Sequence, residues 1–300
     1  MKIDKYIEDN FPSLKGKTYI VTGANSGIGY YASFHLAKLG AKVYLACRNE
    51  GRANNAIKKM HEDDASLDLH FLPYDQSDLK SIETFARCLE EIDFDGLVLN
   101  AAIYHPKEKK MMSVDGYPLI MMTNYLGAFH LLENLEVYLA NKKQYKIVAV
   151  GSLEASNWKE GRLYRTLKEE YKSRTYRYNV SKMLLTKLMI YFGKRSLVNH
   201  RYMVAEPGIS STDITKNMPR FISFLGKYFL RLFFHSPEKA SLTILKALCD
   251  DTNDNPTYFV PRGLFTFSGF PKKKKFKKKH TTNVEYAYIM TRKVLYDEEG

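Results

Sequence analysis

The sequence predicts a doubly wound parallel α/β sheet of about seven strands, because two patterns alternate along it. Short β-branched or apolar runs, which suit buried strands, recur between longer stretches with helical periodicity. This alternation specifies a parallel sheet with helices on both faces, and right-handed crossovers place the ligand crevice at the carboxyl ends of the strands. The predicted strands are Thr18–Thr22, Lys42–Ala46, Leu67–Pro73, Gly96–Asn100, Lys146–Gly151, Arg201–Glu206 and Thr257–Val260.

The clearest helix is predicted between the third and fourth of these strands. Apolar residues recur there at three- and four-residue steps, which places them on one helix face. Ser77 or Asp78 is expected to cap the N-terminus. The apolar positions are Leu79, Ile82, Phe85, Ala86, Leu89 and Ile92.

Length and composition fit one soluble domain. The 300 residues are 45% hydrophobic and 26% charged, which is typical of a globular protein rather than a disordered or fibrous one. Three cysteines without CxxC spacing and histidines without an HExxH motif predict reduced thiols and no metal. The sequence shows neither a secretion signal nor a long apolar span, so we expect a cytoplasmic protein that is soluble or peripheral at a membrane. The expected division is one domain over residues 1–268 and a basic C-terminal extension over 269–300.

Seven lysines within Lys272–Lys279, interrupted only by Phe276, supply more than half of the net charge of +13. Such a run is usually a mobile, solvated element. Contact with anionic lipid or incidental contact with nucleic acid is the alternative. Specific nucleic-acid binding is not expected, because Phe276 is the only aromatic residue inside the run for bases to stack on.

The segment Thr22–Gly29, TGANSGIG, lies between the first predicted strand and a predicted helix. Its glycines Gly23, Gly27 and Gly29 suit a sharp turn, close approach of the backbone to a pyrophosphate, and tight helix packing. Free amides at the helix start would then face the phosphates. The pattern predicts a Rossmann-type dinucleotide site, and a glycine-rich turn without function is the alternative.

The end of the second predicted strand bears on the choice of cofactor. Enzymes that use NAD usually place an acidic residue there to hold the ribose hydroxyls. This sequence has Ala46-Cys47-Arg48-Asn49 instead. Arg48 can form charge-assisted hydrogen bonds with a 2′-phosphate, so NADP (NADPH) is favoured over NAD. The alternative is an exposed loop arginine without a role.

The segment YNVSK places Tyr178 and Lys182 on the same face of a helix. A tyrosine with a pKa near 10 is a poor catalyst at neutral pH, and a nearby ammonium favours its phenolate. The tyrosines at positions 138 and 164 also precede a lysine by four residues. However, only Tyr178 begins a sustained apolar-periodic helix that leads into the sixth predicted strand. Together with the glycine motif, the pair predicts a nicotinamide-dependent oxidoreductase of alcohols or carbonyl compounds.

With these motifs in this order, the chain resembles the short-chain dehydrogenase/reductase family over about residues 15–260. Thr22–Gly29 matches the family's TGxxxGxG, and Asn100-Ala101-Ala102 matches its NAG segment with alanine in place of glycine. The catalytic residues that the resemblance implies are Asn124, Ser152, Tyr178 and Lys182. The cofactor contacts that it implies are Thr22, Gly23, Asn25, Ser26, Gly27, Ile28, Gly29, Arg48, Asp75, Asn100, Ala101, Tyr178, Lys182, Pro207, Gly208 and Thr212.

The resemblance also implies roles. Tyr178 exchanges the proton, Lys182 lowers its pKa and binds the nicotinamide ribose, and Ser152 polarises the carbonyl. Asn124 supports a water relay linked to the lysine, and Asp75 contacts the adenine. For Asn124 and Ser152 taken alone, capping or a core hydrogen bond is the alternative.

The interval between Ser152 and Tyr178 is longer than in compact family members, and it carries many charges. Together with the arginine after the second strand, this resembles the branch that contains retinol dehydrogenases and protochlorophyllide reductase. The branch favours NADP and a bulky apolar substrate. The family further implies a homodimer through the helix around Tyr178–Tyr191.

Arg220–Phe234 is predicted to form an amphipathic helix with an aromatic side and a cationic side. It suits a lid over an apolar substrate, packed onto the domain or onto a subunit partner, and a helix that lies in a membrane interface is the alternative. Two functions of other classes stay open. One is a catalytically idle nucleotide-binding regulatory protein, and the other is a peripheral membrane-interaction protein.

Overall fold

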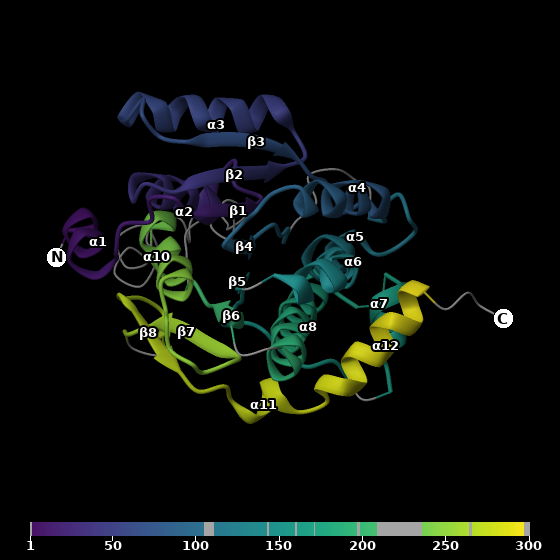
Figure 1. Cartoon of the computed structure of the whole chain (residues 1–300). Coiled ribbons are helices and arrows are strands. Elements are labelled where there is room, and N and C mark those ends of the chain that lie inside the picture. Colours follow the sequence, from purple (N-terminus) through teal and green to yellow (C-terminus); the bar gives the residue numbers. More distant parts are fainter. Residues whose placement is uncertain are drawn as a thin grey trace, which may run out of the picture.

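The computed structural model describes residues 2–104, 111–142, 144–159, 161–170, 172–196, 199–208, 236–263 and 266–296 (Figure 1). Its centre is an eight-stranded sheet in the order β3-β2-β1-β4-β5-β6-β7-β8. Neighbouring strands are parallel except for β7 and β8. The predicted doubly wound fold class is therefore confirmed. The strands are β1 Thr18–Thr22, β2 Lys42–Cys47, β3 Leu69–Pro73, β4 Gly96–Leu99, β5 Tyr145–Val150, β6 His200–Ala205, β7 Thr257–Pro261 and β8 Pro271–Lys274.

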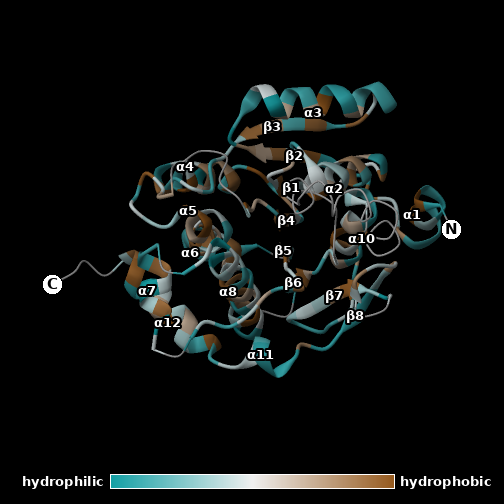
Figure 2. Ribbon diagram, turned by 180° about the vertical axis from the view of Figure 1, so that it is seen from behind, coloured by the Kyte–Doolittle hydropathy of each residue, from teal (hydrophilic) through white to brown (hydrophobic). Residues whose placement is uncertain are grey.

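Helices cover both faces of the sheet. Along β1, Ile20 belongs to one hydrophobic cluster while Tyr19 and Val21 belong to the other, as the alternation of side chains in a strand requires. Figure 2 shows hydrophobic residues in the central strands, whereas the outlying helix α3 is mostly hydrophilic. The helices are α1 Ile3–Asn10, α2 Gly27–Lys38, α3 Glu50–Asp63, α4 Leu79–Glu90, α5 Leu119–Met121, the π-helix η1 Met122–Leu126, α6 Gly127–Asn141, α7 Leu163–Lys168, α8 Arg174–Arg195, α10 Pro237–Leu248, α11 Lys278–Thr281 and α12 Val284–Tyr296.

Helix α4 follows its sequence pattern closely. Ile82, Phe85, Ala86 and Leu89 are buried, as one apolar face requires. Of the two predicted caps, Asp78 takes the role, because its carboxylate accepts a hydrogen bond from the amide of Ser81 at 3.2 Å. Among the helices of the described residues, none is both long and apolar enough to cross a membrane.

The C-terminal segment corrects one prediction. Strand β8, which contains the first lysines of the run, pairs antiparallel with β7, so a mobile, solvated run is wrong for these residues. The Phe276 ring stacks on Tyr258 with 5.1 Å between centroids, and Lys273 pairs with Asp254 at 2.6 Å. Lysines suit an edge strand because their charge prevents pairing with another chain. The domain boundary at residue 268 stays a prediction.

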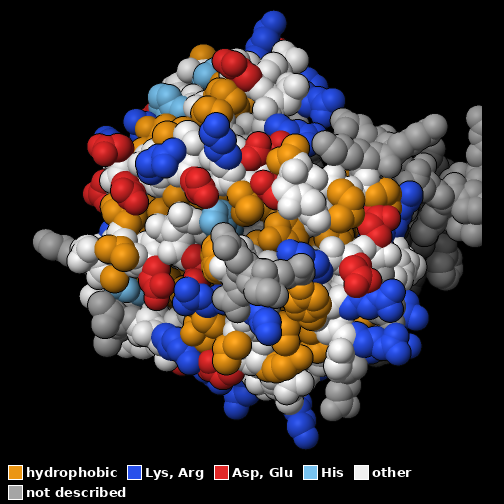
Figure 3. Space-filling view, turned by 90° about the vertical axis from the view of Figure 1, so that its right-hand side faces the viewer, with side chains coloured by type: hydrophobic (Ala, Val, Ile, Leu, Met, Phe, Trp, Pro, Cys, Tyr) orange, Lys and Arg blue, Asp and Glu red, His pale blue; other side chains and the backbone are white. Residues whose placement is uncertain are grey.

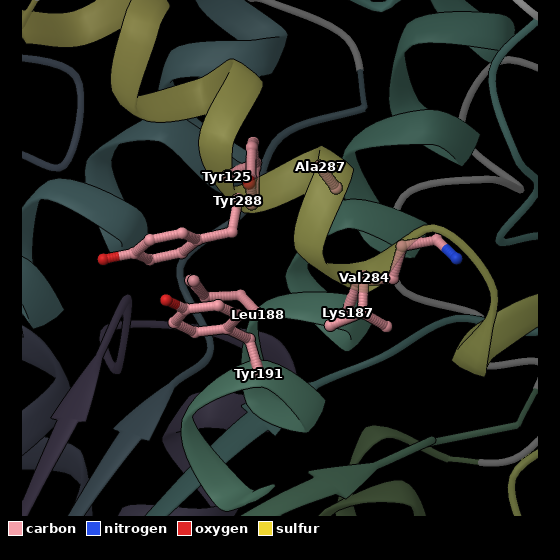
Figure 4. A pocket seen from close by; sticks show the side chains of 7 residues that line it. All are labelled: Tyr125, Lys187, Leu188, Tyr191, Val284, Ala287 and Tyr288. Carbon is pink, nitrogen blue, oxygen red and sulfur yellow. The ribbon is translucent and has the colours of Figure 1, made fainter. Parts of the chain in front are cut away.

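Helix α12 packs along α8. The ring of Tyr288 stacks on Tyr191 with 3.6 Å between centroids, and the narrow space beside this pair is too small for a water molecule (Figure 4). The homodimer was predicted through the helix around Tyr178–Tyr191, and α12 covers part of that helix. The homodimer stays a prediction.

Candidate active site

Thr22 ends β1, and Asn100 follows β4, so both lie where the strand order reverses. Thr22 Oγ1 donates to the carbonyl oxygen of Val98 at 3.1 Å and accepts from the amides of Asn100 and Ala101, both at 3.0 Å. Asn100 Nδ2 donates to the carbonyl oxygens of Thr22, at 2.8 Å, and Gly23, at 3.3 Å. These bonds fix the start of the glycine turn to the segment that follows β4.

The glycine turn has the geometry that its sequence predicts. Gly23 and Gly27 have φ angles of +65° and +61°, in the left-handed region that favours glycine. A β-carbon at Gly29 would lie 2.5 Å from Asn100 Nδ2 and 2.8 Å from the carbonyl oxygen of Gly23. Ser26, at the N-cap of α2, makes no capping bond with its side chain, so the first amides of α2 are left for an anion. This turn and the free amides at the start of α2 fit a dinucleotide pyrophosphate, and the predicted contacts of Asn25 and Ile28, which belong to the same segment, stay predictions.

Arg48 and Asp75 lie together beyond the ends of β2 and β3. Arg48 Nη1 lies 3.6 Å from Asp75 Oδ2, and the Arg48 side chain is 66% exposed. Asp75 Oδ1 also accepts hydrogen bonds from the amide and the hydroxyl of Ser77, at 2.9 and 2.6 Å. An exposed ion pair of this length contributes little stability, so Arg48 is free to turn toward a phosphate. The sequence did not predict that these two residues pair.

Asn124 lies in the π-helix η1 and is fully buried. Its Oδ1 accepts a hydrogen bond from the amide of Ile103 at 2.7 Å. Its Nδ2 donates to the carbonyl oxygen of Ile103 at 2.9 Å and to Ser181 Oγ at 3.2 Å. Asn124 therefore ties the segment after β4 to the helix that carries Lys182. A π-helical turn is frequent at functional sites.

Ser152 and Tyr178 meet in space although they are distant in sequence. Ser152 follows β5, and Tyr178 lies near the start of α8, whose first turn is capped by Ser173 through the amide of Tyr176 at 3.2 Å. The side chains of Ser152 and Tyr178 are hydrogen-bonded to each other. The ring of Tyr104 packs edge-on against Tyr178, with 4.8 Å between centroids.

The pKa of Tyr178 moves in the direction opposite to the prediction. Burial raises it to about 12 and outweighs the hydrogen bond from Ser152, which lowers it. Lys182 is itself buried, and desolvation lowers the pKa of its ammonium to about 8. Its Nζ donates to the carbonyl oxygen of Val150 at 2.9 Å. Burial is thus the main cause of both pKa shifts, and the YxxxK spacing gives no information about burial.

Pro207 and Gly208 follow β6 at the same edge of the sheet. Gly208 has a φ of +75°, and a β-carbon there would lie 2.5 Å from the carbonyl oxygen of Phe267. Just before them, the buried carboxyl of Glu206 bonds to the hydroxyls of Tyr258 and Thr266. Burial raises the pKa of Glu206. Thr212 and the predicted amphipathic helix Arg220–Phe234 lie outside the described residues.

Two residues beside the site were missed by the sequence reasoning. Ser181 bonds Asn124, and its position inside the YNVSK motif was the available signal. Tyr104 contacts Tyr178 from a segment that has no motif. Among the residues that the structure describes, no group of three His, Cys, Asp or Glu side chains could hold a metal ion.

Comparison with known proteins agrees with this geometry. A family model described as short chain dehydrogenase matches residues 17–220. An oxidoreductase of Schizosaccharomyces pombe is 30% identical over 81% of this chain and 75% of its own length. The short-chain dehydrogenase/reductase drtF of Aspergillus calidoustus is 38% identical over 47% of this chain. The match covers only 45% of that relative's length.

Solved structures share the fold. A Mycobacterium paratuberculosis protein superposes with a TM-score of 0.74 at 21% identity, over 95% of this chain and 96% of its own. The Pseudomonas aeruginosa RhlG/NADP active-site complex has a TM-score of 0.59 at 22% identity, over 78% of this chain and 90% of its own. The extent of the family match, with the glycine turn and the contact between Ser152 and Tyr178, leads to one conclusion. This chain belongs to the short-chain dehydrogenase/reductase family of oxidoreductases, which bind nicotinamide cofactors.

Proposed function

We propose that this protein is an NADP(H)-dependent oxidoreductase that interconverts an alcohol and a carbonyl group on an apolar substrate, with Tyr178 as the acid–base residue. One observation carries the proposal. The Tyr178 hydroxyl is hydrogen-bonded to Ser152, and the Lys182 ammonium lies one helical turn further along α8, bonded to the end of β5. A phenol, a hydroxyl and an ammonium group therefore lie near the carboxyl edge of the sheet, and this arrangement supports the proposed roles of proton donor, partner for the substrate oxygen and positive charge.

The chain's own residues would hold the cofactor along this edge. The glycine turn Thr22–Gly29 would bind the pyrophosphate, Arg48 the 2′-phosphate, and Lys182 the nicotinamide ribose. Asp75 would contact the adenine, and Pro207-Gly208 would border the nicotinamide. When bound, NADPH supplies the hydride that the protein cannot.

The proton chemistry favours carbonyl reduction. A phenol with a pKa of about 12 stays protonated at neutral pH, so Tyr178 can donate a proton to a carbonyl oxygen as that oxygen gains negative charge. Ser152 would hydrogen-bond the same oxygen. The Lys182 ammonium would then offset the charge of the phenolate that is left.

The sequence alone supports an apolar substrate. It also supports membership of the branch that contains retinol dehydrogenases and protochlorophyllide reductase. The test is a panel of carbonyl compounds with NADPH: decanal, all-trans-retinal and 9,10-phenanthrenequinone against the polar glyceraldehyde. Faster reduction of the apolar members is expected. Equal or faster reduction of glyceraldehyde would contradict an apolar substrate. No turnover of any compound would favour the alternative of a catalytically idle nucleotide-binding regulatory protein.

Replacing Arg48 tests the cofactor preference. We expect Arg48→Ala to weaken NADPH binding about tenfold, the value of a charge-assisted hydrogen bond of about 1.5 kcal/mol, and to leave NADH binding unchanged. Titration followed by cofactor fluorescence measures both affinities. Arg52→Ala is the matched control, because Arg52 is exposed at the start of α3. Equal losses for NADPH and NADH would remove Arg48 from the cofactor argument.

The pKa of Lys182 predicts a pH dependence. Because the pKa is lowered to about 8, the ammonium is present below that pH and lost above it. The kcat/KM of carbonyl reduction with NADPH should therefore be level below about pH 8 and fall about tenfold per unit above it. Initial rates from pH 6 to 10 measure this profile. A level profile through pH 10 would show that the charge of Lys182 is not needed.

We further propose a cytoplasmic protein with a peripheral contact to anionic membranes. Figure 3 shows cationic side chains interspersed with acidic and hydrophobic ones on the face that carries α12. Co-sedimentation with phosphatidylserine vesicles tests the contact, with the exposed Lys275 and Lys278 changed to glutamate so that β8 keeps its pairing. The homodimer is tested separately, by measuring the molar mass with light scattering after size-exclusion chromatography.

A further inference from the structure

The loop after Ser152 is bonded to the lysine run near the other end of the chain. Lys279 Nζ donates to the carbonyl oxygen of Ala155 at 2.7 Å. In the opposite direction, Asn157 Nδ2 donates to the main-chain carbonyl oxygen of Lys279 at 3.2 Å. The loop and α11 are thus joined by one bond from each side.

A buried lysine of α8 fixes α11 in this position. Lys187 is 1% exposed, and its Nζ donates to the carbonyl oxygens of Lys279 at 2.9 Å, His280 at 3.3 Å and Thr282 at 2.5 Å. Figure 4 shows its nitrogen directed away from the Tyr191–Tyr288 pair. A buried ammonium is costly unless its three N–H groups are satisfied, and these three carbonyls satisfy them.

The loop passes this restraint to Ser152. The amide of Ala155 donates to the carbonyl oxygen of Ser152 at 3.1 Å, so Ala155 is bonded to Ser152 on one side and to Lys279 on the other. The amide of Glu154 donates to Ser152 Oγ at 3.3 Å, and the amide of Ser156 donates to the carbonyl oxygen of Asn179, next to Tyr178, at 3.1 Å. The turn that carries Ser152 is therefore held between α8 and α11.

We propose that Lys279 is a positioning residue for Ser152, held in place by Lys187, so that one lysine of the basic run serves the active site. The proposal rests on the role proposed for Ser152. The proposal also gives Lys279 a role that its neighbours in the run do not share. All the lysines would contribute to an effect of charge, whereas the hydrogen bond to the Ala155 carbonyl oxygen is made by Lys279.

Lys279→Met and Lys278→Met form a matched pair for the test. Both remove one charge from adjacent positions, but Lys278 is exposed. We expect amide hydrogen exchange of the peptide over residues 152–158 to rise about fivefold in Lys279→Met, as expected from one lost hydrogen bond, and not to rise in Lys278→Met. Equal exchange of this peptide in the two variants would overturn the proposal.

Lys187→Met should raise hydrogen exchange over both 152–158 and 278–283. Lys194→Met is its control, since Lys194 is exposed on the same helix. If Lys187→Met does not fold, the Lys279 pair still decides. If exchange rises only over 278–283, Lys187 holds α11 but the loop is held by other contacts, which would also overturn the proposal.

Kinetics distinguish positioning from a general loss of structure. With the fastest carbonyl compound of the panel, Lys279→Met should lower kcat about tenfold and leave the KM for NADPH unchanged, because only the substrate-oxygen partner is displaced. Lys279→Arg keeps a charged donor and should restore most of kcat. A parallel loss of NADPH affinity, or no rescue by arginine, would contradict the positioning role.

The two measurements also separate this proposal from the proposed function. Hydrogen exchange needs no substrate. Equal exchange in Lys279→Met and Lys278→Met would therefore contradict the positioning role and leave the oxidoreductase assignment intact. Conversely, if wild type turns over no carbonyl compound, the proposed function fails while the exchange result still decides whether Lys279 holds the loop.

Discussion

The Tyr178→Phe variant is expected to lose about 10³-fold in kcat while it keeps its affinity for NADPH, since a positioned acid contributes 10²–10⁴-fold. The substitution removes one hydroxyl and leaves the ring. The edge-on contact with Tyr104 at 4.8 Å is therefore retained, and only the hydrogen bond to Ser152 is lost. A proton donor is therefore removed while the packing of the ring is kept.

The control for this variant is Tyr164→Phe. Tyr164 also precedes a lysine by four residues, but it lies on the short helix α7 and is 37% exposed. The turnover of Tyr164→Phe should match that of wild type in the same carbonyl panel. If Tyr178→Phe retained turnover within tenfold of wild type, the phenol would not be the acid. If it lost NADPH affinity to the same degree as kcat, its defect would lie in binding.

The parallel strands could be predicted because each contains a short run of apolar or β-branched residues, even β3, in which only Leu69 is buried. All seven predicted strands occur, with ends displaced by at most two residues. Strand β8 could not be predicted, because Pro271–Lys274 is one proline and three lysines. Its pairing depends on the exposed edge of β7, which is a property of the completed sheet rather than of the local sequence.

The candidate site likewise has features that the sequence could predict and features that it could not. The tight turn at Gly23 and Gly27 was predictable, since only glycine adopts its φ angles without strain. The pKa of Tyr178 was not, because the YxxxK spacing reports a nearby charge and says nothing about burial, which decides the direction here. Nor was the link from Lys279 to Ala155 predictable, because it joins positions far apart in the chain.

The Gly29→Ala variant should lose NADPH affinity about thirtyfold, because overpacking at a rigid site costs about 2 kcal/mol. The added β-carbon would lie 2.5 Å from Asn100 Nδ2, 2.8 Å from the carbonyl oxygen of Gly23 and 3.1 Å from the α-carbon of Ala24. Two of these three atoms are backbone, so the turn itself has to shift. Asn100 has to move as well, and its bonds to the carbonyl oxygens of Thr22 and Gly23 would lengthen.

Gly51→Ala is the matched control for Gly29→Ala, because it adds the same methyl group at a position that has room for it. Gly51 lies in α3, and a β-carbon there would meet only Asn49 Oδ1, at 3.6 Å. Alanine in that helix should stabilise the protein by about 0.5 kcal/mol and leave NADPH binding unchanged. Fluorescence titration and chemical unfolding of both variants measure the two effects. Wild-type NADPH affinity in Gly29→Ala would mean that the glycine turn does not cradle the cofactor, because a turn displaced by a methyl group could not keep the same contacts with a pyrophosphate.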